Sequence, residues 1–209
     1  PLHSDLPRFG RQPLKRSLRT FLRSVFLRLL FGALPISPPK GSNLSMKAPI
    51  LRKETLAPGI SRMVLSAPEV AAHAAAGQFI ILRPTENGER IPLTISDFDP
   101  KAGTVTIVYQ VVGGTTLLLD SLQPGDTLPT FAGPLGRPSH IAGFQNAAVI
   151  GGGLGCAIAL PTAAALHRGG CRVTAIAGFR SAQQVILAQE MAASCDRFLL
   201  CSDDGTAGE

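Results

Sequence analysis

A run of glycines near residue 150 is the segment whose residue types and spacing point most directly to chemistry. It follows the apolar stretch Ala147 to Ile150 and precedes the helix-like stretch Ala157 to His167, so it joins a strand to a helix. Glycine lets main-chain N–H groups approach a pyrophosphate, and the N-terminus of the next helix adds favourable partial positive charge. Cys156 replaces the last glycine of the GxGxxG pattern, so a tight turn without a ligand stays open as the alternative. The loop consists of Gly151, Gly152, Gly153, Leu154 and Gly155.

Two earlier segments also place polar residues at the ends of short apolar runs. The first extends from Arg90 to Ser96, and the second extends from Tyr109 to Thr116. Each segment by itself is an ordinary strand that ends in a turn. Their order is informative, because both precede the glycine loop and lie in a part of the chain with a different structural pattern.

Residues 46–141 have the pattern of a small antiparallel β-barrel. Short β-like runs are separated by turn signals such as Glu86-Asn87-Gly88 and Pro124-Gly125-Asp126. Regular spacing of this kind is typical of closed all-β architectures. One helical turn is expected in residues 70–76 and a short helix in residues 117–122. The predicted strands are Ile60 to Leu65, Gln78 to Leu82, Leu93 to Ser96 and Thr104 to Val112.

From about Gln145 onward, strand-like and helix-like segments alternate. Strands are predicted at residues 147–150, 172–177 and 197–201, and helices at 157–167 and 182–193, with Pro161 expected to kink or shorten the first helix. This alternation indicates βαβ units on a Rossmann-like parallel sheet. Three strands are fewer than such a domain normally has, so we expect it to be incomplete at its C-terminus. The predicted fold is an antiparallel barrel over residues 46–142 followed by an α/β domain over residues 143–209.

The first 45 residues differ from the rest in charge. They carry eight Lys or Arg and one acid, whereas residues 46–209 carry twelve Lys or Arg and thirteen acids. From Leu14 to Leu30, apolar residues recur at helical spacing among arginines, which gives a basic amphipathic segment. A membrane-surface helix and a transit peptide both fit this pattern. The alternative is that the chain starts at Met46 and that residues 1–45 are an extension outside the fold.

Composition excludes several classes of protein. Hydrophobic residues make up 45% of the chain and charged residues 16%, which is typical of a globular protein. The net charge of +6 arises in the first 45 residues, so it gives no reason to expect a nucleic-acid partner. The cysteines have no metal-ligand spacing, so we expect free thiols in a reducing cytoplasm and no metal site within this chain. They are Cys156, Cys171, Cys195 and Cys201.

Six short motifs occur in one order: RIPLTI, YQVVGGTT, FAGPLG, GGGLG, AGFR and DDGTAG. Together they resemble the ferredoxin-NADP reductase superfamily over about Met46 to Glu209. The chain is most similar to the small subunits of NADH-dependent ferredoxin:NADP oxidoreductases, to sulfide dehydrogenase-like flavoproteins and to the electron-transfer subunits of dihydroorotate dehydrogenases. The resemblance implies an FAD-binding barrel followed by a domain that binds NAD(H) or NADP(H).

The resemblance also implies roles for residues of the barrel. Thr94 would lie at the reacting part of the flavin and is the candidate catalytic residue. The family's pyrophosphate-binding Arg stands three places before it, where this chain has Ile91, and the nearest Arg is one residue earlier at Arg90. A slip of one residue on a strand points a side chain to the other face. The residues implied to bind FAD are Arg90, Pro92, Leu93, Thr94, Tyr109, Gln110, Val111, Gly114, Thr115 and Thr116.

In the second domain, the resemblance assigns the pyrophosphate of the nicotinamide cofactor to the glycine loop. Arg180 follows the second strand, where the adenosine ribose lies, and its charge suits a 2′-phosphate. Relatives that use NADH also carry Arg at this place, so NAD and NADP both stay open. Asp203, Asp204 and Gly205 match a family segment near the nicotinamide.

The function implied is electron transfer between NAD(P)H, FAD and an iron–sulfur partner. The partners expected are a larger flavin or iron–sulfur oxidoreductase subunit and a ferredoxin or similar carrier. A [2Fe–2S] centre needs four closely spaced thiolates, so it is expected only beyond Glu209. The electron-transfer subunit of a dihydroorotate dehydrogenase is the alternative within this class. A non-redox binding module on the same fold is the alternative from another class, favoured by the displaced Arg90.

Overall fold

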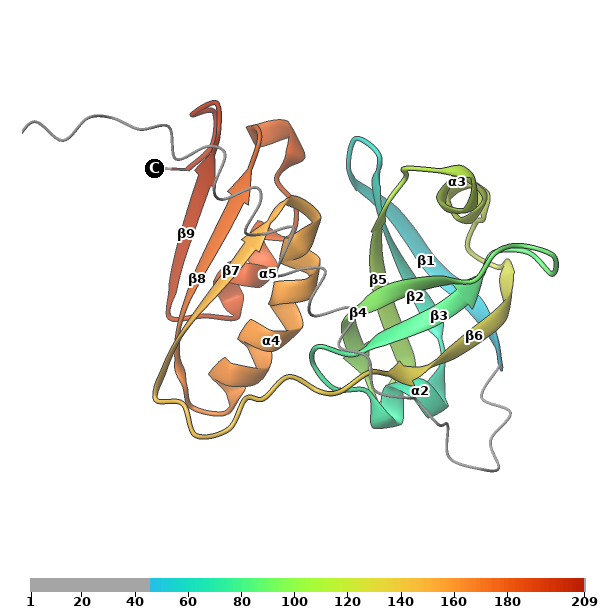
Figure 1. The fold of residues 1–209 in the computed structure, drawn as a ribbon, viewed down its shortest axis with the longest axis horizontal. Helices are drawn as coiled ribbons and strands as arrows, with labels where there is room; N and C mark the ends of the chain where they lie inside the picture. The colour runs from blue at the N-terminus through green and yellow to red at the C-terminus, as the bar shows by residue number, and fades with distance from the viewer. Residues whose placement is uncertain (1–45, 209) are drawn as a thin grey trace, which may run out of the picture. The chain divides into compact units, whose positions relative to one another are not determined.

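The computed structural model describes residues 46–208 (Figure 1). The predicted amphipathic segment Leu14 to Leu30 lies outside the described residues. Among the described residues, no helix is both long and apolar enough to cross a membrane.

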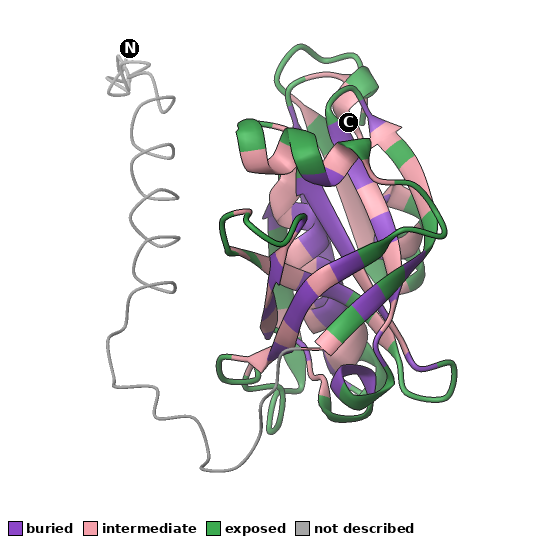
Figure 2. Cartoon of the chain, turned by 90° about the vertical axis from the view of Figure 1, so that its right-hand side faces the viewer, coloured by how far each residue is buried: buried purple, intermediate pink, exposed green. Residues whose placement is uncertain are grey.

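Six antiparallel strands form a closed barrel in the order β1-β2-β5-β4-β3-β6. Along β5, Val105, Ile107 and Tyr109 are buried in the barrel core, which is the alternation expected of a strand with one face inside. Figure 2 shows bands of buried, intermediate and exposed residues along the strands. The antiparallel barrel predicted from turn spacing is therefore confirmed. The strands are β1 (Met46–Ala57), β2 (Ile60–Ser66), β3 (Phe79–Arg83), β4 (Ile91–Asp99), β5 (Thr104–Gln110) and β6 (Thr127–Leu135).

Two short helices pack against the barrel core. α2 (Pro68–His73) contributes the buried Val70 and Ala71, and α3 (Gly114–Ser121) contributes Leu119. The helix predicted at residues 117–122 thus begins three residues earlier. The hydroxyl of Thr116 accepts the main-chain N–H of Gly113 at 3.0 Å, which satisfies a donor at the start of α3.

The second part is a parallel sheet, as predicted, and its strand order is β7-β8-β9. Its strands are β7 (Asn146–Gly152), β8 (Arg172–Phe179) and β9 (Arg197–Ser202), and β7 leads through a short 3₁₀ turn, η1 (Gly153–Gly155), into α4 (Cys156–Arg168). α4 continues through Pro161 for 13 residues, so the expected shortening is wrong. The single helix predicted at 182–193 is also wrong. That segment divides into η2 (Ala182–Gln184) and α5 (Ala188–Ala193), because Leu187 adopts a left-handed conformation with φ of 56°.

One apolar cluster joins the barrel to the α/β part. Ile60 and Val108 of the barrel pack in the same cluster as Cys156 and Leu160 of α4 and Met191 of α5. β6 ends at Leu135 and β7 begins at Asn146, so the predicted domain boundary at residue 142 falls in the connection between them. The fold therefore brings the outer surface of the barrel against the helices that follow the glycine loop.

Candidate cofactor-binding site

The glycine loop joins β7 to α4, and each of three glycines has a separate physical reason. A Cβ on Gly151 would lie 2.8 Å from Cα of Cys156, so glycine is needed for close packing of the helix. Gly153 has φ of +53°, a conformation that favours glycine. Gly152 has extended dihedrals, and a Cβ there would meet no atom within 4 Å. The loop thus has a packed side at Gly151 and an open side at Gly152 and Gly153.

A pocket of about 420 Å³ lies on this open side, at the carboxyl ends of the three parallel strands. Ligands of open α/β sheets bind outside the carboxyl ends of the strands. The barrel contributes Ile60 and Gln110 to the pocket. The pocket is lined by Ile60, Gln110, Gly152, Gly153, Leu154, Gly178, Phe179, Arg180, Gln184 and Asp203.

The structure separates the roles of the residues predicted at the ends of β8 and β9. Arg180 is exposed and lines the pocket, and Asp203 lines it too, held by its N–H donating to the carbonyl of Phe179 at 2.9 Å. The carboxylate of Asp204 instead accepts the N–H of Thr206 at 3.0 Å and also its hydroxyl. Those hydrogen bonds lower the pKa of Asp204, and the positive φ of Gly205 completes a turn. Arg180 and Asp203 are therefore brought to the pocket, whereas Asp204 and Gly205 shape the turn beside it.

Cys156, where the pattern would have a glycine, lies beneath the loop rather than in the pocket lining. Its side chain is fully buried at the start of α4, and burial raises the pKa of its thiol to about 11. A thiol with this pKa stays protonated at neutral pH and packs as a small apolar group. The four cysteines are free, as predicted.

In the barrel, the ladder between β4 and β5 opens at Thr94. The paired residues run from Ile95 with Ile107 to Asp99 with Thr104, whereas residues 91–94 pair with β3 alone among the described strands. The N–H of Ile95 donates to Gln78 on the β3 side at 3.1 Å. Main-chain groups of successive residues point to opposite edges of a strand. Those of Thr94 therefore face the β5 side, where no strand pairs with them, and are available to a planar ligand.

The predicted flavin-lining residues do not all point to the same side. Leu93, Tyr109 and Val111 pack against the barrel core, so their side chains face inward. Pro92 and Gln110 are exposed and Thr94 is half-buried, which is the opposite face of the same strands. Consecutive residues of these strands therefore cannot all present their side chains to one site. Leu93, Tyr109 and Val111 can offer a ligand outside the barrel only their main-chain groups.

The loop that carries Arg90 lies beside the N-terminus of α3. The hydroxyl of Thr115 in the first turn of α3 donates to Oε2 of Glu89 at 3.2 Å. Arg90 is exposed and directly precedes β4. Gly114 has nothing within 4 Å of a would-be Cβ, so the approach to the helix N-terminus is open. The structure thus brings the Arg90 segment and the Gly114 to Thr116 turn together, although 24 residues separate Arg90 from Gly114.

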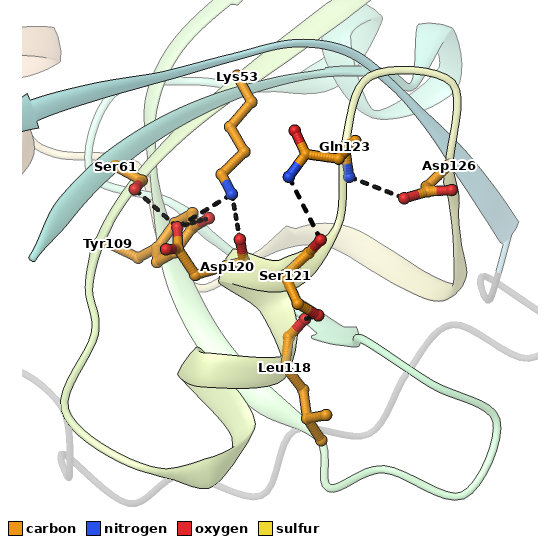
Figure 3. Close-up of polar contacts among 8 residues, drawn as sticks. All are labelled: Lys53, Ser61, Tyr109, Leu118, Asp120, Ser121, Gln123 and Asp126. Atoms are coloured by element: carbon orange, nitrogen blue, oxygen red, sulfur yellow. Dashed lines mark hydrogen bonds and ion pairs between the residues drawn. The ribbon is translucent and has the colours of Figure 1, made fainter.

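A polar network that the sequence did not reveal holds the other end of α3 (Figure 3). Asp120 accepts hydrogen bonds at Oδ1 from the hydroxyls of Ser61 at 2.7 Å and Tyr109 at 3.0 Å, and forms an ion pair with Lys53 at 3.3 Å. Burial alone would raise the pKa of Asp120, but these three partners hold it below its ordinary value. Burial and then the hydrogen bond to Asp120 raise the pKa of Tyr109 well above its usual range.

These shifts predict the pH dependence of the network. The depressed pKa of Asp120 contributes stability that is present above its unfolded value of about 3.9 and is lost as the pH falls through the folded value. The raised pKa of Tyr109 contributes stability that is present below about pH 10 and is lost as the pH rises beyond it. Tyr109 is the only tyrosine of the chain, so ultraviolet absorbance of tyrosinate follows it alone. We expect ionisation well above pH 10, shifted downward by Asp120→Asn. Titration of the folded protein near pH 10 would contradict the network.

Pocket residues outside the recognised motifs escaped sequence reasoning as well. Ile60 reaches the pocket because it follows the hairpin turn at Pro58-Gly59, and Gln184 because it ends the η2 turn after Arg180. The Pro-Gly pair was a usable turn signal for the first. Nothing in the sequence pattern marked the second. Among residues 46–208, no cluster of three or more His, Cys, Asp or Glu could hold a metal ion.

No protein-family model matches the chain. It is similar to a protein of Thermotoga maritima described as a homolog of the dihydroorotate dehydrogenase B (NAD(+)) electron transfer subunit, with 39% identity over 76% of this chain. The corresponding subunit of Streptococcus pneumoniae strain R6 is 33% identical over 76% of this chain. Among solved structures, the NADH-dependent reduced ferredoxin-NADP oxidoreductase, described as a flavin-based electron-bifurcating protein, matches with a TM-score of 0.73 and 37% identity over 81% of this chain.

The chain spans 56%, 63% and 60% of these three proteins, respectively, which is less than two thirds of each. The matches nevertheless cover both the barrel and the parallel sheet, because 76% to 81% of this chain exceeds either part alone. They confirm the resemblance drawn from the six motifs.

Proposed function

We propose that this member of the ferredoxin-NADP reductase superfamily is a flavoprotein subunit that transfers electrons between NAD(P)H, FAD and an iron–sulfur partner. The observation that carries the proposal is the pocket at the glycine loop, whose wall includes Gln110 and Ile60 of the barrel. A dinucleotide on the loop would therefore reach the barrel surface next to the open edge of β4.

The barrel residues fit FAD. Bound FAD accepts a hydride from a reduced nicotinamide and releases electrons singly to a one-electron acceptor. The unpaired main-chain groups of Thr94 can hydrogen-bond a heterocycle, and its hydroxyl lies on the outer side of the same strand. No residue in the first turn of α3 is acidic, and the helix N-terminus favours a diphosphate. The adjacent loop brings the carboxylate of Glu89 to Thr115 and also carries Arg90, so a diphosphate there would replace Glu89 as the partner of Thr115. The displaced Arg90 thus remains suited to a phosphate role.

The loop at the α/β part fits a nicotinamide dinucleotide. Main-chain N–H groups from Gly152 to Leu154 would bind its pyrophosphate. Arg180 at the end of β8 stands where the adenosine ribose of a dinucleotide lies, and Asp203 stands at the end of the next strand. An exposed guanidinium favours NADPH through its 2′-phosphate, while the relatives' names include NAD(+) and NADH. We propose that both forms bind and that Arg180 sets the ratio.

The similar proteins indicate two partners for such a subunit. The similarity to the electron transfer subunits favours a dihydroorotate dehydrogenase, and the similarity to the ferredoxin-NADP oxidoreductase favours a ferredoxin-linked flavoprotein complex. We propose a larger flavin or iron–sulfur subunit of a ferredoxin-linked complex as the first candidate partner and a dihydroorotate dehydrogenase as the second. The four free cysteines suit a reducing compartment such as the cytoplasm.

The test is the visible absorption spectrum of the full chain after reconstitution with FAD, recorded before and after anaerobic NADH or NADPH. We expect flavin bands that are bleached by the nicotinamide. Thr94→Val should keep FAD but slow the bleaching about tenfold, the effect of about 1.4 kcal/mol from one lost hydrogen bond. Thr127→Val, on an exposed strand end of β6, is the matched control and should behave as wild type.

Two results would contradict the proposal in different ways. A folded protein that binds no FAD would favour a non-redox binding module. If the protein binds FAD but neither NADH nor NADPH reduces it, the flavin site is supported and the assignment of the glycine loop to the nicotinamide cofactor is wrong.

A further inference from the structure

We propose that Asp120 is a positioning residue for the cofactor. It holds α3 so that the N–H groups at the N-terminus of this helix face the diphosphate of FAD. The proposal rests on the proposed function and adds to it a residue outside the six motifs. It arises from a partly buried polar cluster at one end of the barrel (Figure 3).

The cluster connects α3 to three neighbouring strands. Ser61 of β2 and Tyr109 of β5 are direct partners in the ladder, and these residues are 3% and 1% exposed. Both hydroxyls donate to the same oxygen of Asp120. Lys53 of β1 adds a charge and also donates to the main-chain carbonyl of Asp120. Asp120 is thus the acceptor on which β1, β2 and β5 converge.

An acidic residue in the last turn of a helix is unfavourable for the helix alone. The helix dipole places partial negative charge there, so a carboxylate costs rather than contributes stability. Lys53 offsets that cost, because its ammonium contacts both the carboxylate and a carbonyl at the helix end. The position of Asp120 is therefore explained by its contacts to the barrel and not by helix formation.

Fixing this end of the helix also fixes the other end. α3 has eight residues, and Asp120 stands one helical turn after Thr116, whose hydroxyl accepts the N–H groups of Val112 and Gly113 at 2.9 and 3.0 Å. Leu119 inserts into the barrel core beside Asp120, and such apolar packing is non-directional. The hydrogen bonds of Asp120 are directional and add an orientation to this contact. A helix of two turns moves as a rigid body, so loosening Asp120 displaces the N–H groups at Gly114 and Thr115.

The experiment compares the dissociation constants of FAD and riboflavin for the full chain and for Asp120→Asn. Both ligands carry the isoalloxazine ring, but riboflavin has no diphosphate. We expect the variant to bind FAD about tenfold more weakly and riboflavin unchanged, a change in the ratio that a general loss of barrel stability would not produce. Tyr109→Phe removes one of the hydrogen bonds and should weaken FAD binding by a smaller factor in the same direction.

Asp126→Asn is the matched control. Asp126 is exposed, and its carboxylate accepts the N–H of Gln123 at 2.7 Å in the turn after α3. Its removal should leave the affinities for both ligands unchanged. Equal FAD affinity in wild type and Asp120→Asn, or equal losses for FAD and riboflavin, would overturn the inference. Absence of FAD binding by the wild type would instead overturn the proposed function.

Discussion

Gly151→Ala is expected to destabilise the protein by about 1–3 kcal/mol, the usual range for overpacking a filled interior. The new methyl would lie 2.8 Å from Cα and 3.1 Å from the main-chain nitrogen of Cys156. Because these are backbone atoms at the start of α4, no side chain can turn away to make room. The helix itself must shift from β7, and the apolar cluster around Cys156 loses its packing.

Gly152→Ala is expected to leave stability unchanged and to weaken binding of the nicotinamide dinucleotide. Its φ of −124° is accessible to alanine, and its Cβ would point into open space. That space belongs to the pocket at the carboxyl ends of the strands. A methyl there keeps a pyrophosphate away from the main chain, so the dissociation constant should rise by about tenfold or more.

The two variants form a matched pair on adjacent residues of one strand. Urea denaturation measures stability, and titration with NADH or NADPH followed by nicotinamide fluorescence measures binding. A stable Gly151→Ala protein would refute the close packing of β7 on α4. Unchanged nicotinamide affinity in Gly152→Ala would remove the glycine loop from the proposed site.

Leu119→Ala should cost about 2–5 kcal/mol in the free energy of unfolding, the range for a leucine truncated in a closed core. Leu119 is 0% exposed and is the residue through which α3 enters the barrel core. The closed barrel cannot collapse freely around the vacated volume, since every strand is held by two neighbours. The cost should therefore fall in the upper half of that range.

Leu118→Ala is the control on the same helix. Leu118 is 47% exposed, so its truncation removes little buried surface and should change stability by no more than about 0.5 kcal/mol. Both substitutions raise intrinsic helix propensity equally, so the difference between them isolates the core contact. Equal losses in urea denaturation would show that α3 does not close the barrel core through Leu119.

The sequence determined those features whose physical cause is local. Glycine and proline turns between short apolar runs identified the barrel strands β2 to β5, and the change to alternating strands and helices identified the parallel sheet. The glycine loop could be recognised because its requirement is a property of the main chain at consecutive residues. The helix predicted at 182–193 was wrong because the chain turns left-handed at the buried Leu187, a conformation that no local preference of leucine favours.

The two strands that close the barrel carry a weaker local signal. β1 includes Pro49 and charged residues, and β6 includes Pro129 and Pro134, which lower the strand signal. β1 pairs with β2, β6 pairs with β3, and β1 and β6 pair with each other, which closes the barrel. The other strands of the sheet decide this pairing, and the local sequences of β1 and β6 do not.

The candidate site shows the same division. The motifs named the segments, but the tertiary structure decided which side chains leave the barrel, placing Thr94 and Gln110 outside and Leu93 and Tyr109 inside. The Asp120 cluster depends on residues 53, 61, 109 and 120, which are far apart in sequence and meet where β1, β2 and β5 are adjacent. Hydrogen bonds depend on distance and direction in space, and only the closed barrel brings these groups within reach of one carboxylate.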